Sequence, residues 1–109
     1  SYANELKQNL LGVEEQTLRA EGAVSSATVR QMLGGLKKQT GADWLIAISG
    51  VAGPSGGTPH KPVGTVWIGL LGPGVEEVKV HQFKGDRAQI QDQSVRQALK
   101  TLLRYVNNV

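Results

Sequence analysis

Hydrophobic residues recur at helical spacing in four stretches of the chain. Gly12 and Gly22 follow the two shorter stretches and suit the end of a helix. Ser25 or Ser26 can cap the third stretch and Asp86 the fourth, because their side-chain oxygens accept from free backbone N–H groups. The pattern predicts helices over residues 3–11, 13–20, 25 or 26 to about 40, and 87–107.

The last of these predicted helices carries a long apolar set. Its members recur three or four positions apart, so they share one side of the helix. We expect this side to pack on a sheet. The set is Ala88, Ile90, Val95, Ala98, Leu99, Leu102, Leu103 and Val106.

Three shorter apolar runs predict strands. Residues 44–49 and 63–71 are continuously apolar, which is typical of strands buried on both faces. The run from Val75 to Phe83 alternates, with Val78, Val80 and its last residue inward, and predicts an edge strand in a hairpin. Helices around this sheet give a layered α/β fold. Three strands are few for it, so part of the sheet is expected to lie outside this chain.

Composition sets limits on this α/β domain. Its 109 residues fit one domain, and 39% hydrophobic residues are typical of globular proteins. The net charge of +3 comes from scattered basic residues, and aromatic residues are few, so no nucleic-acid partner is expected. There is no cysteine, signal peptide or bilayer-spanning run, which favours a cytoplasmic protein without a membrane partner.

The segment from Ser49 to Pro62 is SGVAGPSGGTPHKP, and it joins two predicted strands. Glycine lets backbone N–H groups approach a ligand, and proline limits the freedom of a loop. Ser49 ends its strand, where α/β sheets commonly bind ligands. Thr58, His60 and Lys61 suit a phosphate or a carboxylate, although no Walker A lysine follows. The segment predicts a small-molecule-binding loop, and the alternative is a plain hairpin loop.

Four stretches carry a family resemblance. They are SGVAGPSGGTPHKPVGTVWIGL, SYANELKQNLLGV, GAVSSATVRQM and FKGDRAQIQDQSVRQAL. Together they resemble the signature, the YSNxxKxxxLGV segment, the GAVS motif and the GDR segment of the CinA carboxy-terminal domain family, the nicotinamide mononucleotide amidohydrolases also called PncC. The resemblance covers essentially all of residues 1–109. It implies an α/β/α sandwich with a mixed sheet, and hydrolysis of nicotinamide mononucleotide without a cofactor.

One motif of that family is absent. The family carries its catalytic serine in an ESCTGG segment before the tyrosine, and this chain has no such segment. Either the chain is a fragment whose amino-terminal strand and helix lie elsewhere, or the domain has lost its nucleophile. We favour the fragment, because the missing start methionine and the thin sheet agree with it. The expected partner is a second copy of the chain or a complementary chain that carries the segment.

Tyr2 and Lys7 match the family's catalytic tyrosine and lysine positions. A serine hydroxyl needs a base at neutral pH, and a lysine serves as one where its surroundings disfavour the charged form. A tyrosine can relay the proton. The resemblance therefore implies that both residues act on the serine of the absent segment. The alternative is a surface tyrosine and a solvated lysine.

The remaining candidates bind substrate. Asn4 lies between the two catalytic candidates and can otherwise cap the helix. Ser49 can hold the substrate or satisfy a loop carbonyl. Arg87 suits bidentate phosphate recognition at the start of a helix, or pairs with Asp86 at the surface. Backbone N–H donors are expected at Gly50, Gly53, Gly56 and Gly57.

Two function classes stay open. The first is an amidohydrolase that converts nicotinamide mononucleotide to nicotinic acid mononucleotide and ammonia, in pyridine nucleotide salvage. The second is a non-catalytic nucleotide-binding module of the same family. DNA binding, which the family's competence-related name suggests, has little support because no basic surface is predicted. We expect no metal, because the histidines and acids lack ligand spacing, and we expect His81 to be exposed on its edge strand.

Overall fold

The computed structural model describes residues 2–106, apart from the side chains of Tyr2, Ala3 and Leu6. Within these residues the elements are α1 (Tyr2–Leu11), α2 (Glu15–Glu21), α3 (Ser26–Thr40), β1 (Leu45–Gly50), β2 (Thr65–Gly72), β3 (Val75–Gln82) and α4 (Arg87–Val106). Every predicted helix and strand is confirmed, with ends shifted by at most about two residues.

The predicted helix caps are confirmed. Ser25 Oγ accepts a hydrogen bond from the Thr28 N–H at 3.2 Å. Asp86 and Gln89 form a reciprocal capping box, in which each side chain accepts from the other residue's N–H at 2.9 and 2.8 Å. Gly22 caps the end of α2, where its N–H donates to the Leu18 carbonyl at 3.0 Å. Gly41 ends α3 in the left-handed conformation. The box at Asp86 fixes the start of α4.

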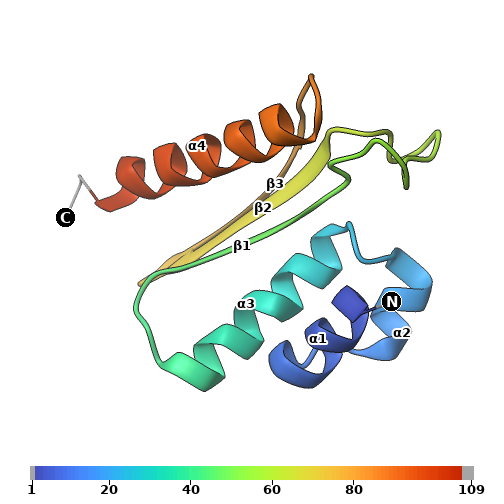
Figure 1. Ribbon diagram of the computed structural model, residues 1–109. Coiled ribbons are helices and arrows are strands. Elements are labelled where there is room, and N and C mark those ends of the chain that lie inside the picture. Colours follow the sequence, from blue (N-terminus) through green and yellow to red (C-terminus); the bar gives the residue numbers. More distant parts are fainter. Residues whose placement is uncertain (1, 107–109) are drawn as a thin grey trace.

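The fold has three layers. Helices α1 to α3 cover one face of the sheet, and α4 covers the other (Figure 1). The strand order is β1-β2-β3, and both neighbouring pairs are antiparallel. The layered α/β fold and the partial sheet are therefore confirmed. Between residues 2 and 106 the sheet contains no parallel pair, in contrast to the mixed sheet that the resemblance implied.

Each face of the sheet has its own hydrophobic core. Toward α3, the β1 residues Leu45 and Ala47 are buried with Val29, Met32 and Leu33. Toward α4, a second cluster joins Val66 and Ile68 of β2 to Ile90 and Ala98 of α4. This division follows from the alternation of side chains along a strand. The two clusters pack α3 and α4 against opposite faces of the sheet. The loop that joins β1 to β2 therefore starts and ends between the two helical layers.

Two predictions about strand burial are wrong. Residues 44–49 were expected to be buried on both faces, yet Ile46 and Ile48 are only half-buried. The reason is that β1 lies at an edge of the described sheet, so its α4-facing side chains have a neighbouring strand on one side only. Val80 was expected to point inward but is 51% exposed, since β3 forms the other edge.

The prediction that the whole apolar set of α4 packs on the sheet is also wrong. The buried face of α4 is formed by Ile90, Ser94, Ala98 and Thr101. The hydroxyls of Ser94 and Thr101 donate to backbone carbonyls one turn earlier, at 2.7 and 2.9 Å, so they are buried with a partner. The apolar residues Val95, Leu99, Leu103 and Val106 remain exposed.

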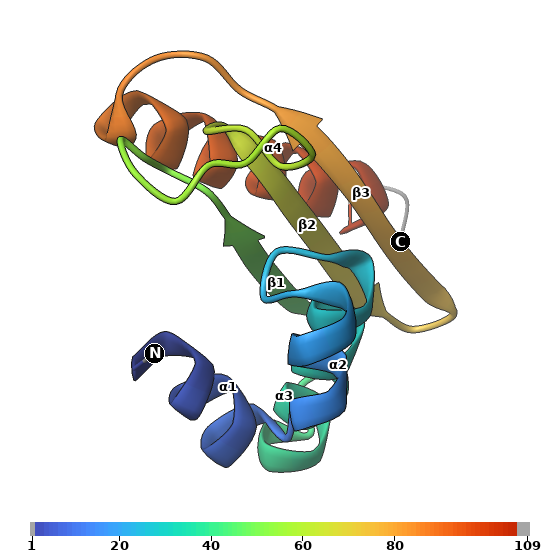
Figure 2. The same ribbon diagram turned by 90° about the vertical axis from the view of Figure 1, so that its right-hand side faces the viewer.

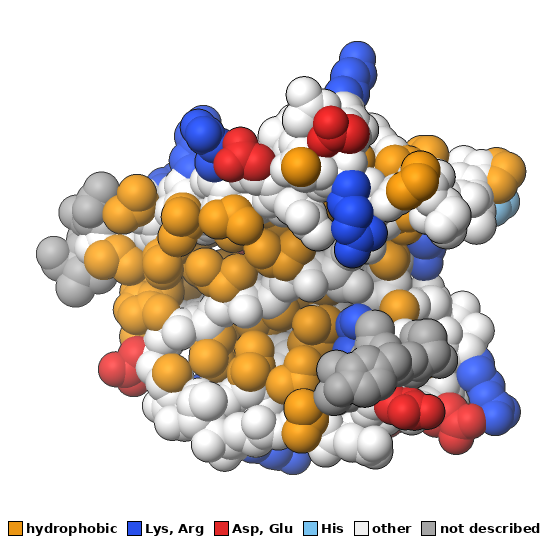
Figure 3. All heavy atoms as spheres, viewed as in Figure 1, with side chains coloured by type: hydrophobic (Ala, Val, Ile, Leu, Met, Phe, Trp, Pro, Cys, Tyr) orange, Lys and Arg blue, Asp and Glu red, His pale blue; other side chains and the backbone are white. Residues whose placement is uncertain are grey.

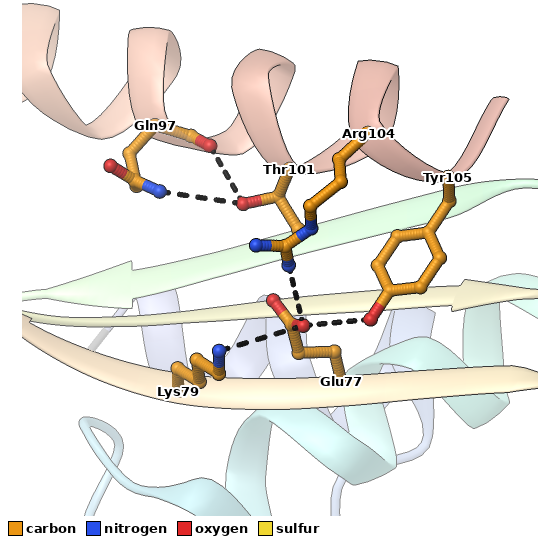
Figure 4. Close-up of polar contacts among 6 residues, drawn as sticks. All are labelled: Glu77, Lys79, Gln97, Thr101, Arg104 and Tyr105. Carbon is orange, nitrogen blue, oxygen red and sulfur yellow. Dashed lines mark hydrogen bonds and ion pairs between the residues drawn. The ribbon is translucent and has the colours of Figure 1, made fainter. Parts of the chain in front are cut away.

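Glu77 joins the outer strand β3 to the end of α4 (Figure 4). Its Oε1 accepts from Arg104 Nη2 at 2.7 Å and from the Tyr105 hydroxyl at 2.8 Å. Lys79 Nζ lies farther away, at 3.7 Å. The side chain of Glu77 is only 15% exposed, so these donors satisfy a carboxylate that has lost most of its water.

Replacing Tyr105 with phenylalanine is expected to lower the free energy of unfolding by about 1 kcal/mol, because a hydrogen bond to a shielded carboxylate is lost. Lys79→Ala is the control and should change it by less than about 0.5 kcal/mol, since Lys79 is exposed and distant. Urea unfolding monitored by tryptophan fluorescence measures both. Equal losses of unfolding free energy in Tyr105→Phe and Lys79→Ala would contradict the stabilising hydrogen bond from Tyr105 to Glu77.

His81 is half-buried rather than exposed as expected. Its ring stacks on Phe83 with 5.4 Å between centroids, and its Nδ1 is buried without a hydrogen-bond partner among the described residues. Burial lowers the pKa of His81 below 6.5, and the nearby Lys79 lowers it further. The Val66 backbone and Glu77 act in the opposite direction. The folded protein therefore favours the neutral imidazole.

The expected consequence is a loss of stability below about pH 6.5, because the unfolded chain then binds a proton that the folded chain resists. The loss sets in as the pH falls through the ordinary histidine pKa of 6.5 and grows toward the lowered pKa of the folded chain. His81→Phe keeps the ring stacked on Phe83 and removes the titration. Melting temperatures between about pH 7.5 and 5.5 should decline less in this variant. If the melting temperatures of the unmodified chain and of His81→Phe decline equally with falling pH, His81 is not the cause of the decline.

Candidate functional site

Backbone hydrogen bonds order the loop between β1 and β2 at its base and at its tip. At its base, the N–H of Val51 donates to the Thr65 carbonyl at 2.9 Å, and the N–H of Gly64 donates to the Val51 carbonyl at 2.6 Å. At its tip, Thr58 and Lys61 exchange backbone hydrogen bonds of 3.0 and 3.1 Å. The ladder of the two strands thus continues into the loop, which ends in a tight turn.

Two positively charged side chains connect this loop to the helices by hydrogen bonds. Arg87, the first residue of α4, donates from Nη1 to the Gly53 carbonyl at 3.2 Å. Lys61 donates from Nζ to the Glu21 carbonyl at the end of α2, at 2.6 Å. Gly53 is buried with φ of +81°, and an added Cβ would lie 2.6 Å from Val63 Cγ1. A larger residue does not fit at this attachment point.

A groove of about 480 Å³ runs between the loop base, β1 and α4. Its apolar wall includes Ile48, Val66 and Ile90, and Arg87 supplies a cation at its margin. This volume is in the range of small-molecule sites. The arrangement suits an anionic ligand with a flat apolar part. The lining residues are Ile48, Gly50, Ala52, Val66, Arg87, Ile90, Gln91, Ser94 and Val95.

The loop candidates divide between the two faces of the sheet. Gly50 lines the groove, and Gly53 borders it through its bond to Arg87. Gly56 and Gly57 are exposed toward the tip and are not among the groove's lining residues. Ser49 is 7% exposed, and its hydroxyl donates to the Ala23 carbonyl before α3, at 2.7 Å. The Ser49 hydroxyl must break its hydrogen bond to Ala23 before it can donate one to a substrate.

The α1 candidates lie apart from the groove. Asn4 lines a hollow between α1 and α2, and this hollow shares no lining residue with the groove that contains Arg87. Lys7 is partly buried on the same helix. The side chain of Tyr2 lies outside the described residues. Figure 2 shows, however, that α1 and the free edge of β1 lie on the same side of the molecule.

Several residues of the site were not predicted. Gln91 and Ser94 line the groove from α4. Lys61 was expected to suit a phosphate or a carboxylate, and its anchoring of the loop to α2 was not predicted. A signal for Ser94 existed, because it stands one turn after Ile90 on the face that continues to Ala98. The bond of Lys61 to α2 spans forty residues of sequence and left no local signal.

Among residues 2–106, no group of three histidines, cysteines or acids is arranged to hold a metal ion. No helix in this range is both long and apolar enough to cross a bilayer.

Comparison with known proteins decides the family. The family model described as the CinA C-terminal domain matches residues 1–106. The chain belongs to this family. Among curated CinA-like proteins, that of Thermotoga neapolitana is 52% identical over 106 residues, and that of Syntrophotalea carbinolica is 47% identical over 109 residues. The CinA resemblance that the loop and its flanking segments carried is thus confirmed.

Solved CinA structures share the fold. A competence damage-inducible protein A (ComA) from Klebsiella pneumoniae matches 95% of this chain with a TM-score of 0.89 and 40% identity. A competence/damage-inducible protein from Agrobacterium tumefaciens matches 95% with a TM-score of 0.84 and 36% identity. The matched parts are 65% and 64% of those two chains. The chain spans 26% of the curated CinA-like proteins of Thermotoga and Syntrophotalea.

Proposed function

We propose that this CinA domain is the substrate-binding part of an amidohydrolase that converts nicotinamide mononucleotide to nicotinic acid mononucleotide and ammonia. The observation that carries the proposal is the groove in which Gly50 at the end of β1 and Arg87 at the start of α4 lie together. Its apolar wall fits a pyridine ring, and the guanidinium fits a phosphate. The shared motifs of the family supply the reaction class.

The reaction would proceed by acyl transfer. The serine of an ESCTGG segment supplied outside this chain attacks the carboxamide carbon, the C–N bond breaks, and ammonia leaves. Water then hydrolyses the ester, which releases the carboxylate product and restores the serine. The family resemblance assigns the proton transfers to Lys7 and Tyr2 on α1, so the proposal requires the supplied segment to place its serine between the groove and α1. Backbone N–H groups near Gly50 and Gly53 are assigned to the oxyanion.

Substrate anchoring falls to Arg87 in this proposal. The guanidinium reaches the loop with Nη1 and leaves other donors for a phosphate. Ser49 and Asn4 remain secondary candidates, since Ser49 is bonded to Ala23 and Asn4 lines a different hollow. Gly56 and Gly57 contribute only if the loop tip folds toward the ligand.

The alternative function is a non-catalytic pyridine-nucleotide-binding module. It needs the same groove and Arg87 but no serine. The two proposals therefore agree on binding and differ on turnover, so they are separated by supplying the ESCTGG segment rather than by changing the groove.

Arg87→Ala is expected to weaken binding of nicotinamide mononucleotide roughly ten- to a hundredfold, because a charge-assisted hydrogen bond is worth about 1.5–3 kcal/mol. Arg87→Lys should restore part of this loss, since the charge returns without the planar fork. Arg96→Ala is the matched control on α4, because Arg96 is exposed and paired with Asp92. Isothermal titration calorimetry measures all four proteins, each joined to an ESCTGG segment whose serine is replaced by alanine so that the nucleotide is bound and not hydrolysed. Unchanged affinity in Arg87→Ala would remove Arg87 from the site.

A further inference from the structure

The groove that contains Arg87 is lined by few polar side chains. Three of its lining residues, Arg87, Gln91 and Ser94, carry a polar side chain, and all three belong to α4. Figure 3 shows hydrophobic side chains gathered along α4 and beneath it, in keeping with the apolar lining from β1 and β2. In a site of this kind the few polar groups fix the orientation of the ligand.

Two of these three side chains are already engaged. The Arg87 guanidinium donates from Nη1 to the Gly53 carbonyl, and it carries no acceptor. The buried Ser94 hydroxyl donates its proton to the Ile90 carbonyl at 2.7 Å, so only its lone pairs remain. Gln91 is therefore the lining side chain that can both donate to a ligand and accept from it.

The amide of Gln91 differs from the other glutamine amides of α4. Gln89 completes the cap at the start of the helix. Gln93 donates to two backbone carbonyls at 2.7 and 2.9 Å, and Gln97 donates to a threonine hydroxyl at 3.5 Å. The side chain of Gln91 makes no hydrogen bond to any residue between 2 and 106. Its full hydrogen-bonding capacity is thus available to a ligand in the groove.

The spacing of Arg87 and Gln91 fits two successive parts of a nucleotide. Four residues separate them, so they lie on one side of α4 and about 6 Å apart along its axis. In a mononucleotide the ribose follows the phosphate, and a phosphate on Arg87 therefore brings the ribose hydroxyls to Gln91. Each hydroxyl donates and accepts, as the carboxamide does. The pyridine ring then crosses from α4 to the apolar wall of Ile48 and Val66.

We propose that Gln91 binds the two ribose hydroxyls of the nucleotide and makes the groove selective for ribonucleotides. The Gln91 Nε2 donates to one hydroxyl, and Oε1 accepts from the other. This inference rests on the proposed function, in which Arg87 holds the phosphate, and it adds the contact that reads the sugar. A nucleotide without the two hydroxyls loses both hydrogen bonds to Gln91.

A binding cycle with two nucleotides tests this contact. The chain joined to an ESCTGG segment whose serine is replaced by alanine is titrated by calorimetry with nicotinamide mononucleotide. It is also titrated with the analogue in which both ribose hydroxyls are replaced by hydrogen. Gln91→Ala should weaken binding of nicotinamide mononucleotide roughly tenfold, because two neutral hydrogen bonds are lost. The same substitution should change binding of the analogue by less than about twofold.

Two further variants separate this contact from general effects. Arg87→Ala should weaken binding of both nucleotides by the same factor, because both carry the phosphate. Gln97→Ala is the matched control, since it removes another glutamine amide of α4 that does not line the groove. It should bind both nucleotides as the unmodified protein does. Gln91 is exposed and alanine favours a helix, so circular dichroism should show unchanged helix content in Gln91→Ala.

Two results would overturn the assignment of Gln91. They are an equal loss of affinity for both nucleotides in Gln91→Ala, or an unchanged affinity of this variant for nicotinamide mononucleotide. With either result the protein can still release ammonia once its serine is restored, so the proposed hydrolysis would stand without Gln91. Ribose selectivity through Gln91 without ammonia release would keep the assignment and exclude the hydrolysis. Binding of neither nucleotide to the unmodified protein would overturn both.

Discussion

Replacing Lys7 with alanine, in the chain joined to the ESCTGG segment, is expected to lower ammonia release from nicotinamide mononucleotide roughly a thousandfold. The reason is that the serine then lacks the base that removes its proton. The fold should persist, because the structural bond of Lys7 comes from its backbone carbonyl, which accepts from the Val13 N–H at 3.0 Å. Steady-state ammonia assays and circular dichroism measure the two effects.

Lys38→Ala is the matched control for this loss, since Lys38 is an exposed lysine on the neighbouring helix α3. It should keep full activity. Binding of the substrate to Lys7→Ala should change little, because the proposal gives the phosphate to Arg87. Normal turnover in Lys7→Ala would remove Lys7 from the mechanism and leave the proton transfers without an assigned base.

Gly35→Ala is expected to cost about 3 kcal/mol of folding free energy or to displace α1. An added Cβ at this position would lie 1.7 Å from the carbonyl oxygen of Leu11, the last residue of α1. Backbone cannot yield as a flexible side chain does, so α1 must move. Because α1 carries Asn4 and Lys7, activity of the completed protein should fall as well.

Gly34→Ala provides the control within the same helix. No atom lies within 4 Å of a Cβ added at Gly34, and the residue is exposed. Alanine favours a helix over glycine by about 0.5–1 kcal/mol, so this variant should be slightly more stable than the unmodified chain. Thermal unfolding of the two variants measures the difference. A Gly35→Ala protein as stable as Gly34→Ala would mean that α1 does not pack as described.

The helices and strands were predictable because local signals agreed with tertiary structure. Ser25 and Asp86 both cap the helices that they were expected to cap. The apolar pattern of β2 likewise matched a central strand with core on both faces. Periodicity reports which residues are apolar, and in these elements apolar residues were also buried.

Burial was predicted less well at the edges of the sheet. Ile48 and Leu99 have the sequence pattern of core residues but are partly or largely exposed in this chain. An apolar pattern shows that a residue is suited to a buried position. It does not show whether the element that would cover the residue lies within this chain. The expectation failed at these residues because no other element between residues 2 and 106 covers the edge of β1 or the side of α4 on which they lie.

The candidate site was predictable only in part. Arg87 and Gly50 lie at one groove, which agrees with a helix start meeting a strand end. The bond of Ser49 to Ala23 was not predictable, because it joins residues far apart in the chain through a fold that periodicity does not specify. The separation of Asn4 from the groove likewise depends on how α1 packs on α3.

Ammonia release from nicotinamide mononucleotide, by this chain joined to the ESCTGG segment, is the most direct test of the central claim. We predict one ammonia for each nicotinic acid mononucleotide formed, with no turnover by the chain alone or after the serine of that segment is changed to alanine. Binding of the nucleotide by the completed protein without any ammonia release would contradict the enzyme and support a binding module.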